Sequence, residues 1–175
     1  MLLSILKIKR YLFLIIFTSL SCNSTIERIN LPPNYKIHDK VSWFKMKSSL
    51  LNKPVAQVKI IDDSLRNIQN VPEKLKKNSY LWKESKAIWL QRCSICHGKN
   101  GNLENVAVTN VIPRKFSTIG MSIGFLFGGD KMRKGIFRKI RDGVKNKNRI
   151  VTMPAWNQVL SFEQIWGLTF YIEEL

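Results

Sequence analysis

The sequence predicts an all-α fold for residues 79–175, preceded by an irregular N-terminal extension. Two stretches, residues 81–93 and 161–175, carry apolar side chains at the spacing that places them on one helical face. Within residues 23–78, the apolar segments 41–46 and 55–61 are too short to sustain that period. An apolar content of 45% is that of a globular protein, so a core can form.

The sequence predicts three helices, and the second and third have their own capping signals. The first buries one face, formed by Leu81, Ser85, Ile88 and Trp89. A second is capped by Asp130, is ended by Gly143, and has apolar positions at Met132, Ile136, Phe137 and Ile140. The last begins at a capping box of Ser161 and Gln164 and continues to the C-terminus. Residues 102–129 are predicted to be loop-like, because a proline and four glycines interrupt them.

The first helix leads into Cys93-Ser-Ile-Cys96-His97, which is typical of covalent haem attachment. Each thiol can add across one haem vinyl group, and His97 is then placed to ligate the iron. The two cysteines fall one helical turn apart, so both reach the same edge of a flat ring.

Two other interpretations of this motif were weighed. A zinc site needs two further ligands, and the only unused ones are Cys22 and His38, both far upstream. A thioredoxin-like redox pair needs a surrounding βαβ pattern, which the sequence lacks. Haem attachment is therefore favoured.

The N-terminus predicts export. Lys7, Lys9 and Arg10 precede an apolar run of eleven residues, 11–21, which matches a secretory signal and is too short to span a bilayer. Because Cys22 follows directly, residues 1–21 resemble a bacterial lipoprotein signal and Cys22 is the expected lipid anchor. An ordinary signal peptide or an uncleaved anchor is the alternative. Residues 22–78 are expected to be a partly ordered tether, with Met46 packed and His38 facing solvent.

The formal net charge of +17 is spread over the whole chain and comes with no nucleic-acid motif. Residues 131–149 hold nine basic side chains and one acid, Asp142. This stretch predicts either a merely solvated surface or a docking face for the acidic surface of a redox partner.

Residues 80–175 resemble the class I cytochromes c. The resemblance rests on the attachment motif with its helix, on Ile112-Pro113-Arg114-Lys115-Phe116, on Ile140-Arg-Asp-Gly143 followed by Met153-Pro-Ala-Trp156, and on the closing helix from Ser161. It implies a helical shell around one covalently bound haem c. It also implies that the first and last helices cross at Ser85 and Trp89, with Ser85 where the family has glycine.

Further site residues follow from this resemblance. The carbonyl of Pro113 would accept a hydrogen bond from the His97 ring, and Arg114 and Trp156 would contact the haem propionates. Met153 would be the second axial ligand of the iron. Met121 is a competitor for that position, and Met132 is expected to be core.

The resemblance implies an exported monohaem electron carrier rather than an enzyme, tethered to the periplasmic side of the membrane through Cys22. A haem-bearing subunit of a larger membrane oxidase, reductase or dehydrogenase complex is the second hypothesis. A haem enzyme or sensor with an open sixth site is the third, and it requires that Met153 is not a ligand.

Overall fold

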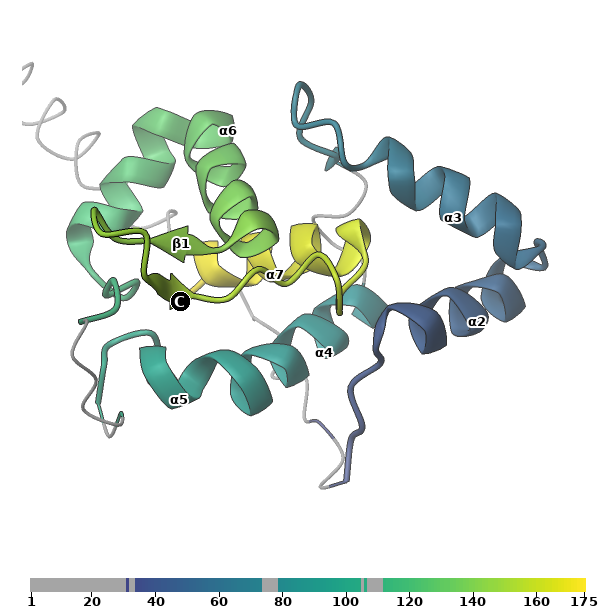
Figure 1. The fold of residues 1–175 in the computed structure, drawn as a ribbon, viewed down its shortest axis with the longest axis horizontal. Coiled ribbons are helices and arrows are strands. Elements are labelled where there is room, and N and C mark those ends of the chain that lie inside the picture. Colours follow the sequence, from purple (N-terminus) through teal and green to yellow (C-terminus); the bar gives the residue numbers. More distant parts are fainter. Residues whose placement is uncertain (1–30, 32–33, 74–78, 105, 107–111) are drawn as a thin grey trace, which may run out of the picture. The chain divides into compact units, whose positions relative to one another are not determined.

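A computed structural model describes residue 31 and residues 34–73, 79–104, 106 and 112–175, and most of these residues are helical (Figure 1). The predicted all-α fold is confirmed. The helices are α2 (Lys40–Leu51), α3 (Val55–Ser64), α4 (Ser79–Ile88), the π-helix η2 (Trp89–Cys93), α5 (Ser94–His97), α6 (Ile119–Asp142) and α7 (Phe162–Glu173). Two strands, β1 (Val144–Lys145) and β2 (Val151–Met153), form an antiparallel hairpin. The predicted signal and Cys22 lie outside the described residues.

The helix predicted to lead into the cysteines runs from α4 through η2 into α5. The π-helical turn η2 ends at Cys93, and single π-helical turns within α-helices are frequent at functional sites. Within this run, the Ser94 hydroxyl donates to the carbonyl of Leu90, four residues earlier, at 2.7 Å. Gly98 ends the run with a φ of 76°, in the left-handed region that favours glycine.

Helix α7 is the centre of the core. The predicted capping box is present. The Ser161 hydroxyl accepts from the backbone amide of Gln164, and the Gln164 side-chain oxygen accepts from the backbone amide of Ser161. Every residue from 161 to 170 is buried, because α4 and α6 both pack against this helix. Trp166 stacks on Phe137 of α6 with ring centroids 4.2 Å apart.

The crossing of α4 and α7 depends on Gly167. A Cβ atom at Gly167 would lie 2.5 Å from the Ser85 hydroxyl oxygen and 2.6 Å from Cγ of Leu81. Class I cytochromes c have a glycine on the first helix at this crossing, where this chain has Ser85. In this chain, Gly167 on α7 allows the two helices to approach closely. The close contact continues through Tyr171, whose ring lies 5.6 Å from Trp82 and 6.3 Å from Trp89.

Helix α6 begins earlier than predicted. Thr118 caps it by accepting from the Met121 amide, so the glycine-rich stretch expected to be a loop is its first half. Gly129 interrupts the helix with a φ of 37° and a ψ of −116°, directly before the predicted start at Asp130. The glycines therefore produce a kink instead of a loop. Gly143 ends the helix as predicted.

The extension contains two helices that the apolar pattern did not predict. Each buries only two residues, Trp43 and Phe44 in α2 and Val58 and Asp62 in α3, which is too few to show a period in the sequence. Asp39 caps α2 by accepting from the Ser42 amide at 2.8 Å.

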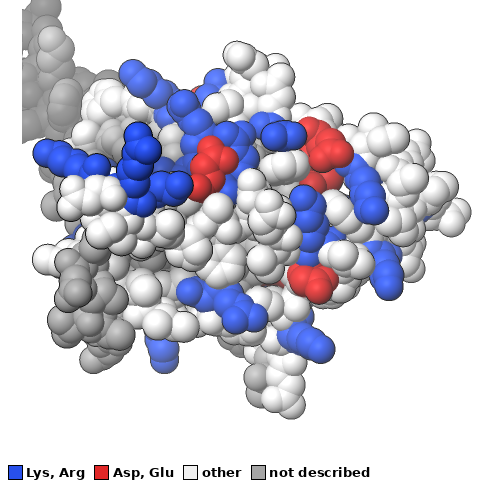
Figure 2. Space-filling model, viewed as in Figure 1, with Lys and Arg blue, Asp and Glu red and all other residues white. Residues whose placement is uncertain are grey.

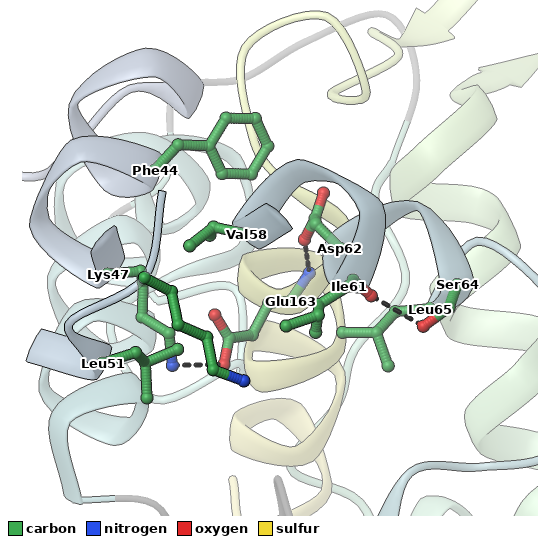
Figure 3. A pocket seen from close by; sticks show the side chains of 10 residues that line it. Phe44, Lys47, Leu51, Val58, Ile61, Asp62, Ser64, Leu65 and Glu163 are labelled. Carbon is green, nitrogen blue, oxygen red and sulfur yellow. Dashed lines mark hydrogen bonds and ion pairs between the residues drawn. The ribbon is translucent and has the colours of Figure 1, made fainter. Parts of the chain in front are cut away.

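Polar contacts join these helices to the N-terminus of α7 (Figure 3). The Asp62 carboxylate accepts from the amides of Phe162 at 3.0 Å and Glu163 at 2.8 Å, and so caps α7 from another helix. Glu163 in turn accepts from the Trp43 indole and pairs with Lys47, both at 2.9 Å. Burial raises the pKa of Asp62, and the hydrogen bonds that it accepts from these two backbone amides oppose the rise.

His38 does not face solvent as expected. Its ring Nδ1 lies 3.0 Å from the fully buried carboxylate of Glu84 on α4, and its amide donates to the same group at 2.7 Å. Tyr35 and Gln164 also donate to Glu84, at 2.8 and 3.0 Å. Met46, in contrast, packs partly buried against the core.

Gly167→Ala should lower the free energy of unfolding of the holoprotein by about 1–3 kcal/mol, because the added methyl overpacks the helix crossing. Gly120→Ala is the matched control: its Cβ would meet only the Thr118 hydroxyl, at 4.0 Å, so a helical alanine there should be neutral or stabilising. Denaturant unfolding measures both variants. If Gly167→Ala were as stable as the wild type, the close crossing would be contradicted.

Candidate functional site

A cavity of about 620 Å³ contains the predicted site residues. Its walls come from η2 and α5, residues 112–116, α6, the β-hairpin and α7. All the residues expected to bind haem or iron line it: Cys93, Cys96, His97, Pro113, Arg114, Met153 and Trp156. Met121 and Met132 line it as well.

The two thiols stand at the end of one helical run, Cys93 closing η2 and Cys96 within α5. Both are free and half-buried. Burial raises the pKa of Cys93 to about 12, with a smaller contribution from Cys96, so this group is a protonated thiol at neutral pH. Both atoms of a thiol S–H are retained when it adds across a vinyl double bond, so attachment of haem to this pair would release no leaving group.

The His97 ring is oriented by a backbone carbonyl. Its Nδ1 lies 3.1 Å from the carbonyl oxygen of Arg114, and this corrects the expected acceptor, Pro113, by one residue. A proton on Nδ1 leaves Nε2 with the lone pair that a metal requires. Burial lowers the pKa of His97 although the Arg114 bond opposes the change, so the ring is neutral at neutral pH.

Two aromatic rings limit the movement of that imidazole. Phe116 lies 5.0 Å and Trp89 5.8 Å from the His97 ring, between centroids. Trp89 is itself fixed, because its indole N–H donates to the Lys99 carbonyl at 2.8 Å. The Phe116 amide donates to the Gly101 carbonyl at 2.7 Å, which ties residues 112–116 to the turn after His97.

Met153 ends β2, and the end of α6 holds it in place. A Cβ atom at Gly143 would lie 2.6 Å from the Met153 carbonyl oxygen and 2.8 Å from the Ala155 amide nitrogen. The methionine segment therefore passes where only glycine leaves space. The Trp156 amide then donates to the Ile140 carbonyl at 3.0 Å, joining the segment to α6 a second time.

The other two methionines of the cavity differ from Met153 in their surroundings. Met121 lies in the first half of α6, and its sulfur is 3.2 Å from the Arg114 Nε, which donates to it. Met132 follows the kink, packs partly buried against the core as expected, and also lines the cavity.

The residues present fit a haem. The lining is mostly apolar, as a porphyrin face requires, and it offers two thiols, one imidazole and thioether sulfur. Gly135 lines the cavity, and a Cβ there would meet no protein atom within 4 Å, so the wall has room for a flat group. A second cavity of about 320 Å³, between α2, α3 and Glu163, has no thiol, imidazole or thioether in its lining.

The helical fold and this set of donors define a class I c-type cytochrome, as the sequence predicted. Residues 81–172 match the family model described as cytochrome c oxidase, cbb3-type, subunit III. Because the match covers more than half of the chain, the chain belongs to this family. Membership implies covalently bound haem c and a function in electron transfer. Comparisons with curated proteins and with solved structures gave no match.

Sequence reasoning missed three supports of the site. The Arg114 carbonyl is a backbone group, and no side-chain pattern marks it. Trp89 was assigned to the core, and its ring does reach the site from there. Gly143 was recognised as a helix stop and as part of the motif that precedes Met153, but not as the point where the Met153 backbone approaches α6.

Proposed function

We propose that this chain is a monohaem c-type cytochrome that transfers single electrons between respiratory partners outside the cytoplasmic membrane. One observation carries the proposal: Cys93, Cys96, His97 and Met153 line a single cavity of haem-compatible size. The count of one haem rests on the single Cys-x-x-Cys-His motif in a chain with three cysteines.

When bound, haem c supplies a one-electron Fe(III)/Fe(II) couple. Cys93 and Cys96 would hold it covalently, and His97 and Met153 would ligate its iron, which would leave no place for oxygen or peroxide to bind. Pro113 would pack beside it, and Arg114 and Trp156 would contact its propionates. No side chain acts as an acid, base or nucleophile.

The partner is a redox protein with an acidic docking surface. Basic side chains gather over α6 in the view of Figure 2. Of the nine basic residues in 131–149, six are exposed: Lys131, Arg138, Lys139, Lys145, Lys147 and Arg149. Arg133 pairs with Glu173 and Asp130, and Arg141 with Asp142, so these two are partly neutralised. Lys131 and Lys139 also line the haem cavity, which places positive charge where electrons would leave.

A fixed subunit of a membrane oxidase complex is the second candidate, and the family description favours it. Helices α2 and α3 pack on α7 through Asp62, Trp43 and Lys47 instead of lying free. An ordered extension of this kind suits a permanent interface better than a flexible tether does. Stable co-purification with membrane subunits would favour this candidate, and free monomeric protein the first.

The membrane contact of the proposed carrier is a lipid on Cys22 after export. The short apolar run ending at this cysteine supports it. Among the described residues, no helix is long and apolar enough to cross a membrane. Mass spectrometry of the mature N-terminus should find an acylated Cys22, and any other first residue would contradict this anchor.

Met153→Ala should open the sixth coordination position. The wild-type protein should be low spin and should not bind carbon monoxide, whereas the variant should bind it stoichiometrically and have a lower reduction potential, because a thioether favours Fe(II). Visible spectra of both redox states, with and without carbon monoxide, measure this.

Met121→Leu and Met132→Leu are the controls, because they keep side-chain volume while removing the other two cavity sulfurs. Both should leave the low-spin spectrum nearly unchanged. A wild type that is already high spin, with Met153→Ala spectroscopically silent, would contradict the electron-carrier proposal and favour a haem enzyme or sensor.

Electron exchange with the partner should slow as salt rises, because charges more than about 8 Å apart are largely screened at physiological ionic strength. Lys131→Glu/Lys139→Glu should lower the rate at low salt and flatten its salt dependence. The control Lys45→Glu/Lys59→Glu changes charge equally on α2 and α3 and should leave the rate unchanged. Stopped-flow kinetics measure the rates, and a rate indifferent to salt would mean that the basic face is only solvated surface.

A further inference from the structure

The first half of α6 carries an exposed apolar stripe. Its members are Ile119, Ile123, Leu126 and Phe127, with 81, 50, 77 and 84% of their surfaces exposed. Their spacing of four, three and one residues places them on one face of the helix. These side chains contribute little to the core, and none of the functions described above uses them.

The opposite face of the same half-helix is also apolar. Met121 and Phe125 are 3 and 8% exposed, and Met121 lines the haem cavity. A surface helix ordinarily presents polar side chains on its outer face, and one that is apolar all round is ordinarily covered. A contiguous exposed patch of four large apolar side chains marks a contact surface.

The distribution of charge around the stripe indicates what covers it. Residues 116–129 contain no charged side chain, whereas Arg114 and Lys115 precede them. After the kink at Gly129 come Asp130, whose carboxylate pairs with Arg133 at 2.8 Å, and Lys131. Lys115 and Lys131 are both exposed. An apolar stripe with cations at each end is complementary to an acyl layer beneath anionic headgroups.

The length of the half-helix agrees with contact at the surface of a bilayer instead of insertion across it. Ten residues at about 1.5 Å each extend for about 15 Å, half the roughly 30 Å of hydrocarbon. A helix of this length can lie in the plane of the interface with its apolar face buried by about 5–10 Å.

We propose that Ile119, Ile123, Leu126 and Phe127 dock into the surface of an anionic lipid bilayer, with Lys115 and Lys131 against its headgroups. This contact is separate from the Cys22 anchor and does not depend on the electron-transfer proposal. A lipid at one chain end leaves the domain free to rotate, whereas the stripe lies on the helix that also forms a wall of the haem cavity. Docking would therefore fix how the cavity faces the membrane.

Photolabelling of the full-length holoprotein tests the contact directly. Vesicles of phosphatidylcholine and phosphatidylglycerol carry a trace of phospholipid with a diazirine in its acyl chain, and the labelled protein is cleaved with trypsin. Cleavage after Lys115 and Lys131 releases peptide 116–131 with the whole stripe, and cleavage after Lys59 and Arg66 releases peptide 60–66 as an internal reference. The reference contains Ile60, which is 70% exposed on α3.

The expected result is about tenfold more label on peptide 116–131 than on peptide 60–66. In Leu126→Ser/Phe127→Ser, the label on peptide 116–131 should fall by a similar factor. The reason is that each buried side chain of this type contributes about a factor of ten or more to partition into the bilayer. The control Val41→Ser/Ile60→Ser removes equally exposed apolar groups and should leave the label on 116–131 unchanged. An unchanged visible spectrum shows that each variant is folded.

Equal labelling of the two peptides would overturn the proposal, because it would show that any exposed apolar group near the vesicle reacts. The proposal would also be overturned if peptide 116–131 carried no label and Leu126→Ser/Phe127→Ser instead lost association with a membrane protein. That result would assign the stripe to a protein partner. Because labelling reports contact of the polypeptide, it can fail while the redox spectra of the holoprotein remain as proposed.

Discussion

The close contact of α4 with α7 at Gly167 is the constraint on which the rest of the structure depends. Leu81 and Ser85 meet α7 where no side chain separates the helices. The helix that continues into Cys93, Cys96 and His97 is therefore fixed against the buried centre of the domain. Since α6 also packs on α7, the same helix determines the distance between the two walls of the cavity.

The chemistry of the site follows from rigid placement of soft and neutral donors. His97 is kept neutral by burial and is oriented by the Arg114 carbonyl, while Phe116 and Trp89 restrict its ring. On the other wall, Gly143 lets the Met153 segment approach α6 closely. Rigid placement of the donors suits one-electron exchange, which is fast when the ligands of the iron rearrange little.

The elements with strong local signals could be predicted from the sequence, and those that depend on tertiary contacts could not. The capping box of Ser161 and Gln164 and the stop at Gly143 were both correct, because caps depend on local backbone hydrogen bonds. Helix α2 buries too few residues to show a period, and it is stabilised by contacts such as that between Trp43 and Glu163, 120 residues apart. The glycine-rich half of α6 was predicted as a loop because glycine has a low helix propensity. Its buried side chains, Met121 and Phe125, outweigh that propensity.

The same distinction holds for the candidate site. The attachment motif was predicted from residue type and spacing, and Met153 from the resemblance to the class I cytochromes c. The structure brings them to one cavity. The acceptor for His97 was assigned one residue too early, because a carbonyl belongs to every residue and only the path of the chain selects one.

The central claim is that Cys93 and Cys96 hold a single haem covalently. Mass spectrometry of the purified protein under denaturing conditions tests this most directly, because only a covalent group remains with the unfolded chain. The account predicts a polypeptide heavier by the mass of one haem, with the added mass on the peptide that contains both cysteines. A polypeptide without that mass, or haem released intact by acid and acetone, would contradict it.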